Sequence, residues 1–247
     1  MRRTTLALLA LFFLWTSEAF AVSMMYWTDF RQQTIERANL DGTSREVLVS
    51  LGEGVHPHGI ALDIANNHVY WAEYGGHRIR RASLDGSGMV TLVVEPSSTD
   101  NIAGLALDLI ARRMYWTEAY IGVAAIRSAN LDGSDIRDVL TTPSARNVEI
   151  AGGRLYWTDW HAGTLESANL DGSDRRLLRS DLSLPYGLEV DLARGFIYWA
   201  DSASNSNRIR RADLDGSGVT DVLVGLDDPV ALALDLHRAE GGRTLQD

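Results

Sequence analysis

Met25-Tyr26-Trp27-Thr28-Asp29 is the first of five closely similar stretches in this chain of 247 residues. The other four are Val69-Tyr70-Trp71-Ala72-Glu73, Met114-Tyr115-Trp116-Thr117-Glu118, Leu155-Tyr156-Trp157-Thr158-Asp159 and Ile197-Tyr198-Trp199-Ala200-Asp201. Successive Tyr-Trp pairs lie 44, 45, 41 and 42 residues apart. A repeat length in this range is typical of propeller blades and solenoid units. The chain is therefore predicted to be an array of five structural repeats.

The second repeat shows the unit most completely. Residues 59–63 alternate large and small side chains at period two, which predicts a strand. Residues 68–73 are apolar or aromatic on both faces, as expected of a strand that is covered on both sides. Residues 78–84 and 89–94 predict a third and a fourth strand. Four short antiparallel strands without helical periodicity predict a propeller blade.

A turn of Asp and Gly separates the third and fourth strands of every repeat. Asp favours the start of a turn through its side chain, and Gly accepts positive φ. The turn lies fifteen to seventeen residues after each Tyr-Trp pair, at Asp41-Gly42, Asp85-Gly86, Asp132-Gly133, Asp171-Gly172 and Asp215-Gly216. The predicted fold class is therefore all-β, a β-propeller of four-stranded antiparallel blades.

The two ends of the array suggest how the ring closes. The first repeat begins at its Tyr-Trp strand, so the first blade is expected to lack its innermost strand. Residues 229–235 (PVALALD) resemble an innermost strand with no Tyr-Trp strand after it. We expect this C-terminal strand to complete the first blade and close five blades into a ring. The alternative is an incomplete six-bladed propeller, whose exposed edges would favour self-association.

The first 21 residues differ from the rest of the chain. Arg2 and Arg3 precede an apolar run over residues 6–15, and Ala19-Phe20-Ala21 supplies small residues for cleavage. This pattern predicts a secretory signal peptide cleaved after Ala21, and the run is too short to span a bilayer. An uncleaved membrane anchor is the alternative. The predicted organisation is a signal peptide over 1–21, a propeller over 22–236 and a C-terminal tail over 237–247, secreted and without a transmembrane segment after cleavage.

Composition narrows the possible partners and chemistries. The formal net charge is −10, which makes nucleic acid and anionic membranes poor partners. Cysteine is absent, so the chain has no disulfides, thiolate metal ligands or cysteine nucleophile. An exported chain of this kind must rely on its core and on the closure of its ring.

The repeat resembles the class B repeat of the low-density lipoprotein receptor family. A Tyr-Trp-Thr-Asp strand followed by Ala-Asn-Leu-Asp-Gly is clearest at residues 156–159 with 168–172, and at 26–29 with 38–42. The resemblance implies an extracellular, non-catalytic propeller that binds ligands on one face, with structural roles for the aromatic and acidic motif residues. The family's propellers are six-bladed and are usually flanked by cysteine-rich modules, whereas this chain has five copies and no cysteine.

Aromatic residues lie just behind four of the five Tyr-Trp strands. The loops after the second strand and before the first strand of a blade share one face, because antiparallel strands alternate in direction. Rigid aromatic side chains are typical anchors of protein interfaces. Alternatively, the rings fold back and seal the core. The four residues are Phe30, Tyr74, Tyr120 and Trp160.

The loops that lead into the innermost strands reach the same face near the axis. Unlike the motif residues, their side chains differ from blade to blade, as a ligand site requires. Any single one of them is more simply explained as a solvated loop residue. The candidate ligand-binding residues are His56, His58, Asn101, Arg146, Tyr186 and Asp228. His56 and His58 with Asp228 are only a weak indication of a metal site.

Two carboxylates interrupt the small-residue pattern of the innermost strands. Glu149 and Glu189 stand where other copies have Ala61, Ala106 and Ala233. Burying these carboxylates beside the axis without water would cost free energy. We therefore expect them to line a wet channel or to face a cation.

Three functions are compatible with these patterns. The first is a secreted, non-catalytic binding or scaffold module that needs no cofactor or metal and presents its face to a protein or peptide ligand, basic or amide-rich. The second is a lactonase-like hydrolase with an axial divalent metal held by Glu149, Glu189, Asn101 or Asp228. The absence of a Ser-His-Asp or His-rich pattern counts against the hydrolase hypothesis. The third is a self-associating extracellular structural protein.

Overall fold

The computed structural model describes residues 24–39, 43–95, 101–118, 124–202, 207–226 and 229. The predicted signal peptide, the closing strand beyond Pro229 and the C-terminal tail lie outside the described residues. Within these ranges the chain forms five antiparallel sheets, one of three strands and four of four strands.

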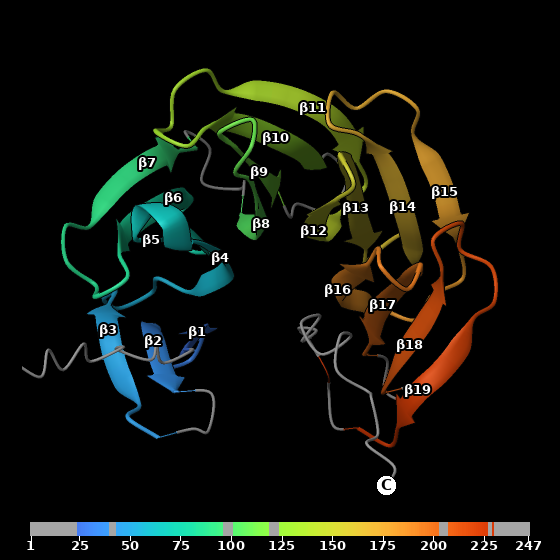
Figure 1. The fold of residues 1–247 in the computed structure, drawn as a ribbon, viewed down its shortest axis with the longest axis horizontal. Coiled ribbons are helices and arrows are strands. Elements are labelled where there is room, and N and C mark those ends of the chain that lie inside the picture. Colours follow the sequence, from blue (N-terminus) through green and yellow to red (C-terminus); the bar gives the residue numbers. More distant parts are fainter. Residues whose placement is uncertain are drawn as a thin grey trace, which may run out of the picture.

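The sheets follow one another along the chain as five blades around a common centre (Figure 1). Blade 1 contains β1 (Met24–Asp29), β2 (Thr34–Asn39) and β3 (Glu46–Ser50). Blade 2 contains β4 (Pro57–Asp63), the 3-10 turn η1 (Ile64–Asn66), β5 (His68–Glu73), β6 (Arg78–Ser83) and β7 (Val90–Val94). Blade 3 contains β8 (Ile102–Asp108), β9 (Arg113–Glu118), β10 (Ala124–Asn130) and β11 (Arg137–Thr142). Blade 4 contains β12 (Ala145–Ala151), β13 (Arg154–Asp159), β14 (Thr164–Asn169) and β15 (Arg176–Arg179), and blade 5 contains β16 (Pro185–Asp191), β17 (Phe196–Asp201), β18 (Arg208–Asp213) and β19 (Thr220–Val224).

The predicted five-bladed β-propeller is confirmed. Blades 2 to 5 have the expected four strands, and blade 1 begins at its Tyr-Trp strand as the sequence predicted. The innermost strands β4, β8, β12 and β16 each contact the next, and β1 contacts β4. Closure of the ring by residues 229–235 stays a prediction, because all but Pro229 of that strand lie outside the described part of the chain.

The motif tryptophans form the core between consecutive blades. In blades 2 to 5 their side chains are 0% exposed, at Trp71, Trp116, Trp157 and Trp199. The core cluster between blades 2 and 3 is typical, because Trp116 packs there with Tyr70, Ile79 and Val93 of the preceding blade. Each blade therefore buries its aromatic strand against its neighbour, and no blade encloses a core of its own.

The motif threonines bond consecutive blades to each other. The hydroxyl of Thr28 donates to the carbonyl of His58 at 2.8 Å, and that of Thr158 donates to the carbonyl of Tyr186 at 2.5 Å. Each hydroxyl comes from a Tyr-Trp strand, and each carbonyl belongs to the innermost strand of the next blade. These bonds fix the position of the innermost strands and of the loops before them.

The motif carboxylates hold the ends of the Tyr-Trp strands. Asp159 accepts the backbone N–H of Ala162 at 2.8 Å and that of Ser144 at 2.7 Å. Ala162 lies in the loop after β13, and Ser144 lies in the loop before β12. One buried carboxylate thereby ties together the two loops of the predicted ligand face.

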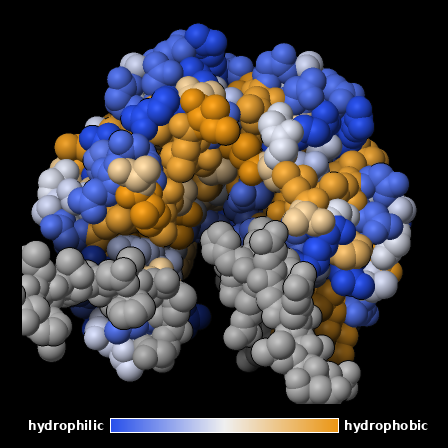
Figure 2. All heavy atoms as spheres, in the orientation of Figure 1, coloured by the Kyte–Doolittle hydropathy of each residue, from blue (hydrophilic) through white to orange (hydrophobic). Residues whose placement is uncertain are grey.

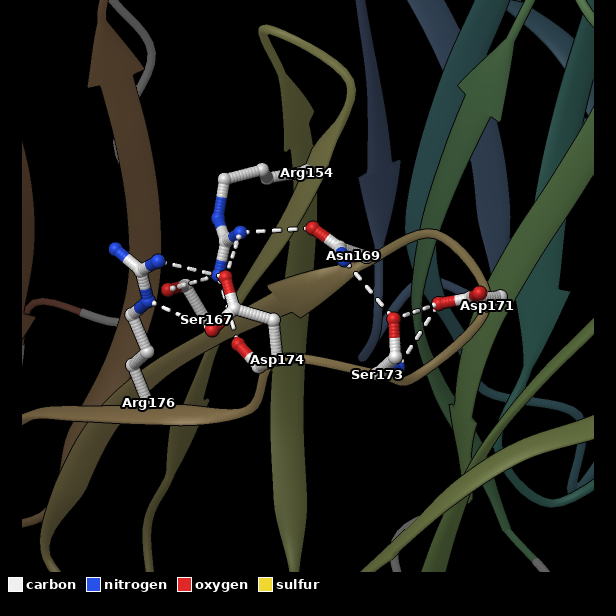
Figure 3. Close-up of polar contacts among 7 residues, drawn as sticks. All are labelled: Arg154, Ser167, Asn169, Asp171, Ser173, Asp174 and Arg176. Carbon is white, nitrogen blue, oxygen red and sulfur yellow. Dashed lines mark hydrogen bonds and ion pairs between the residues drawn. The ribbon is translucent and has the colours of Figure 1, made fainter.

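The Asp-Gly turns of blades 2 to 5 have the predicted structure, and Asp41-Gly42 of blade 1 lies outside the described residues. In blade 4 the carboxylate of Asp171 accepts the backbone N–H of Ser173 at 2.9 Å and its hydroxyl at 2.5 Å (Figure 3). Gly172 has a φ of +83°, and a Cβ at this position would collide with the backbone carbonyl of Val139 in blade 3. Glycine is therefore required both by the turn and by the close approach of the two blades.

An arginine on the Tyr-Trp strand braces this turn in blades 3 and 4. Arg154 donates to Asn169 at 2.8 Å, to the carboxylate of Asp174 at 2.9 Å and to the hydroxyl of Ser167 at 3.2 Å (Figure 3). Arg113 makes the equivalent bonds one blade earlier. The arginine joins the second strand of its blade to the third strand and to the turn that follows.

The distribution of side chains agrees with this packing. On the face shown in Figure 2, apolar residues gather toward the centre of the propeller and hydrophilic residues surround its periphery. Among the described residues, no helix has the length and apolarity that crossing a membrane requires.

Trp116→Ala is expected to destabilise the propeller severely. The substitution leaves a cavity between blades 2 and 3, where the indole is 0% exposed, and such truncations cost about 3–5 kcal/mol. Urea denaturation of the full chain measures the loss. The matched control is Glu53→Ala in an exposed turn, which should leave the unfolding midpoint nearly unchanged. Similar losses for both variants would contradict the assigned blade packing.

Arg154→Ala should destabilise blade 4 through its lost hydrogen bonds. Because Asn169 and Ser167 each lose a partner, we expect a loss of about 1–3 kcal/mol in the free energy of unfolding. Arg176→Ala removes a second, 61% exposed arginine from Asp174 and should cost about 0.5 kcal/mol or less. Thermal and urea unfolding of both variants provide the comparison, and equal losses would show that the brace contributes nothing beyond surface charge.

Candidate ligand-binding face

The predicted loops lie on one face of the propeller. Phe30, Tyr74 and Trp160 directly follow β1, β5 and β13. The backbone N–H of Tyr74 donates to the carbonyl of His56 at 2.8 Å, which joins the loop after β5 to the loop before β4. The two kinds of loop therefore meet, as the alternation of strand directions predicted.

The first part of the site lies between blades 1 and 2. The rings of Phe30 and His56 are stacked, with centroids 4.3 Å apart and an interplanar angle of 14°. His56 Nδ1 also lies 3.0 Å from the carbonyl oxygen of Phe30. The ring of Tyr74 is 6.4 Å from that of Phe30 and 6.2 Å from that of His58.

Arg146 extends the site across the next blades. Its guanidinium lies 5.4 Å from the ring centroid of Tyr74, 5.4 Å from that of Tyr186 and 6.0 Å from that of Trp160. The rings of Trp160 and Tyr186 are themselves 6.4 Å apart. These distances are within the range of cation–π attraction. One arginine thus connects rings that come from blades 2, 4 and 5.

Seven of the ten residues predicted from the sequence form one continuous surface, which we call the aromatic–arginine cluster. Its members are Phe30, His56, His58, Tyr74, Arg146, Trp160 and Tyr186. Asn101 is half-buried just before β8, and these ring contacts do not extend to it. Tyr120 and Asp228 lie outside the described residues.

The cluster combines packing with exposure. Phe30 is 44% exposed, and the other six members are half-buried. The indole N–H of Trp160 donates to the hydroxyl of Ser144 at 2.5 Å, which fixes the orientation of this ring. Nothing in the sequence pattern distinguished Ser144, because its role depends on the position of a ring sixteen residues away. The rings therefore contact neighbouring loops and remain partly exposed. Their role as interface anchors stays a prediction.

The electrostatics of the cluster are dominated by Arg146. Burial, together with the positive charge of Arg146, lowers the pKa of His58 to about 3, although a hydrogen bond to the backbone of Ala103 acts in the opposite direction. His58 is therefore neutral at physiological pH. Arg146 Nε is buried and has no hydrogen-bond partner among the described residues. A buried donor without an acceptor costs free energy.

The two carboxylates on the innermost strands interact with each other. Glu149 on β12 and Glu189 on β16 occupy equivalent positions, opposite Tyr156 and Tyr198 in their blades. Burial and the negative charge of Glu189 raise the pKa of Glu149 to about 8, and burial raises that of Glu189 to about 7. The pair thus resists full ionisation, because burial disfavours the charged form of both carboxyl groups. The wet channel or facing cation expected from the sequence stays a prediction.

Neither predicted metal arrangement can be completed from the described residues. Within these ranges, no three His, Cys, Asp or Glu side chains converge as metal ligands. Both arrangements included Asp228, which lies outside the described part of the chain. Glu149 and Glu189 supply two carboxylates, fewer than the three protein ligands typical of a catalytic zinc site.

The fold and its repeated aromatic strands define the chain as a β-propeller of Tyr-Trp repeats. The family model for low-density lipoprotein receptor repeat class B matches residues 23–64 and 153–192. The chain carries class B repeats, and the family resemblance is confirmed.

Relatives share part of this sequence. Protein cueball of Drosophila grimshawi is 35% identical over 142 residues, which cover 55% of this chain and 24% of the relative. The corresponding protein of Aedes aegypti is 28% identical over 154 residues, covering 60% of this chain and 23% of the relative. The chain spans less than a quarter of these relatives.

Solved structures share the fold. A chain from the crystal structure of a nidogen/laminin complex has a TM-score of 0.74 at 27% identity, and the match covers 84% of this chain and 80% of that chain. A gluconolactonase from Xanthomonas campestris has a TM-score of 0.61 at 19% identity, covering 73% of this chain and 67% of that chain. The second likeness concerns the fold alone.

Glu149→Gln should remove a pH-dependent destabilisation. The pKa of Glu149 is about 4.3 in an unfolded chain and about 8 in the folded chain. Protonated Glu149 therefore stabilises the folded chain fully below about pH 4.3, and this stabilisation is lost as pH rises through about 8. The variant should therefore gain stability relative to the wild type as pH rises. Urea midpoints measured at about pH 5 and about pH 9 give the difference. Glu53→Gln in an exposed turn is the control. The raised pKa would be contradicted if the midpoint of Glu149→Gln relative to the wild type changed no more between the two pH values than that of Glu53→Gln.

Proposed function

We propose that this chain is a secreted, non-catalytic binding module that captures a protein or peptide ligand on the aromatic–arginine cluster. The observation that carries the proposal is the contact of Arg146 with the three rings of Tyr74, Trp160 and Tyr186. Trp, Tyr and Arg are the residues most often found at interaction hot spots.

The rigidity of the cluster supports binding. Phe30 stacks on His56, Trp160 is hydrogen-bonded to Ser144, and Asp159 holds the loops on both sides of Trp160. Side chains that are already fixed lose little conformational entropy when a ligand binds. The exposed part of each ring is then available as contact area at low cost.

The chemistry of the cluster favours an amide-rich ligand. The guanidinium of the half-buried Arg146 offers N–H donors to a ligand carbonyl. A strongly basic ligand would place like charge beside the guanidinium, which is unfavourable in a partly desolvated site. Of the two ligand types expected from the sequence, the amide-rich type therefore agrees better with the described residues.

The comparisons support the same kind of function. The similar chain at 27% identity comes from a complex of two proteins, nidogen and laminin. The predicted signal peptide over residues 1–21 supplies the route to the extracellular space. The lactonase-like alternative rests on a likeness of fold and on two carboxylates, without a converging set of metal ligands among the described residues.

Selection of peptides from a displayed library on the full mature chain tests the proposal. Peptides enriched by the wild type should bind the Phe30→Ala, Tyr74→Ala double variant at least about tenfold more weakly, because loss of a hot-spot residue costs about 2 kcal/mol. Binding is measured by biolayer interferometry, and circular dichroism confirms the fold of each variant.

Ile110→Ala serves as the matched control. Ile110 is a large apolar residue, 98% exposed, in the loop between β8 and β9 and so at the opposite end of the strands. Its truncation should leave peptide affinity unchanged. Enriched peptides that bind the double variant as well as the wild type, or that depend on Ile110, would overturn the assignment of the ligand face.

A further inference from the structure

The interface between consecutive blades has two different halves. The earlier blade contributes a tyrosine face, which comprises its motif Tyr, an apolar residue of the third strand and an apolar residue of the outer strand. The later blade contributes a tryptophan face, which comprises its motif Trp and the residue before its motif Tyr. Between blades 2 and 3, Tyr70, Ile79 and Val93 pack in this way against Met114 and Trp116.

Blade 5 leaves its tyrosine face open. Leu223 is 55% exposed, whereas Val93 at the equivalent position of blade 2 is 2% exposed. Tyr198 and Ile209 are half-buried. The corresponding Tyr70 and Ile79 are both 0% exposed. The last blade therefore exposes an apolar surface of the kind that blade 2 buries against blade 3.

Blade 1 leaves its tryptophan face open. Met25, directly before the motif Tyr, is 36% exposed, whereas the four equivalent residues are 0% exposed. Trp27 is half-buried, in contrast to the fully buried indoles of blades 2 to 5. The four buried equivalents of Met25 are Val69, Met114, Leu155 and Ile197.

A polar contact of this interface also lacks its second half. In blade 4, Arg175 pairs with Glu166 at 2.6 Å and donates across the interface to the carbonyl of Thr141 at 2.8 Å. In blade 1, Arg45 makes the same pair with the buried Glu36 at 2.6 Å, but its side chain is 60% exposed. Arg45 borders a hollow of about 440 Å³ that also contacts Thr34 and Val47. The arginine is thus placed to reach the outer strand of a preceding blade.

We propose that two copies of this chain associate head to tail, with the tryptophan face of blade 1 in one copy packed on the tyrosine face of blade 5 in the other. Blades 1 and 5 lie at the two ends of the arc in Figure 1. Each copy carries both halves of an interface that the chain already uses four times within itself, so the open faces are complementary. By the register of the outer strands, Arg45 then donates to the carbonyl of Val224 in the other copy.

This association is independent of the aromatic–arginine cluster. The contact is heterologous, because different surfaces of the two copies meet, and each added copy leaves one face open at either end. It differs from the closure of the ring by residues 229–235, which would bring the same two faces together within one chain. The two arrangements give different masses in solution.

Sedimentation velocity of the full mature chain tests the proposal. The wild type should form dimers and larger species as its concentration rises. Leu223→Arg and Met25→Arg each place a charge in one open face and should each weaken association at least tenfold. An equimolar mixture of the two variants should form a dimer and nothing larger, since only one complementary pair of intact faces remains. Ile110→Arg, at an exposed apolar position away from both faces, should behave as the wild type.

Two results would overturn the proposal. The first is a wild-type chain that stays monomeric at every concentration. The second is a fall in melting temperature for Leu223→Arg and Met25→Arg without a change in mass, which would place the two faces against each other within one chain. If either arginine variant fails to fold, Arg45→Ala and Val224→Asp replace it, because both side chains are largely exposed. Unaltered association of these variants would likewise exclude the interface.

Discussion

The packing of each motif tryptophan against the preceding blade is the interaction on which the structure depends. A four-stranded blade is too thin to enclose a core, so its apolar surface must be buried against another blade. The indoles of Trp71, Trp116, Trp157 and Trp199 supply that burial at a fixed place in every repeat. The threonine hydroxyls and the turn glycines then set how closely the blades approach. A chain without disulfides can hold this shape because each interface repeats the same contacts.

The ligand face follows from this scaffold. The motif residues fix the ends of the Tyr-Trp strands, and the residues directly behind them are free to vary. Phe30, Tyr74 and Trp160 occupy these positions, and Arg146 and Tyr186 meet them from the first residues of the innermost strands β12 and β16. Variation is thus concentrated in loops that a rigid framework holds in place, an arrangement common to binding proteins. The same repetition leaves the first and last blades with surfaces that have no neighbour among the described blades.

Much of the site was predictable from the sequence, although its internal contacts were not. Strand alternation was sufficient to place the loops after the second strands and before the first strands on one face. The stacking of Phe30 on His56 and the three rings around Arg146 depend on side-chain directions and on the spacing of the blades. Neither can be obtained from the sequence pattern. The effect of Arg146 and burial on His58 was equally inaccessible, because the two residues are far apart in the chain. The hydrogen bond from Trp160 to Ser144 could likewise not be predicted from the sequence.

The sequence by itself determined the number of blades, the order of their strands and the positions of the Asp-Gly turns, because these depend on local periodicity and on turn chemistry that repeats every 41 to 45 residues. Only the tertiary structure decided which side chains of the ligand face touch, that burial and the charge of Glu189 raise the pKa of Glu149, and that apolar faces of blades 1 and 5 are exposed. These properties arise from distances between residues of different blades. Such distances are set by the packing of whole sheets, and no single repeat contains them.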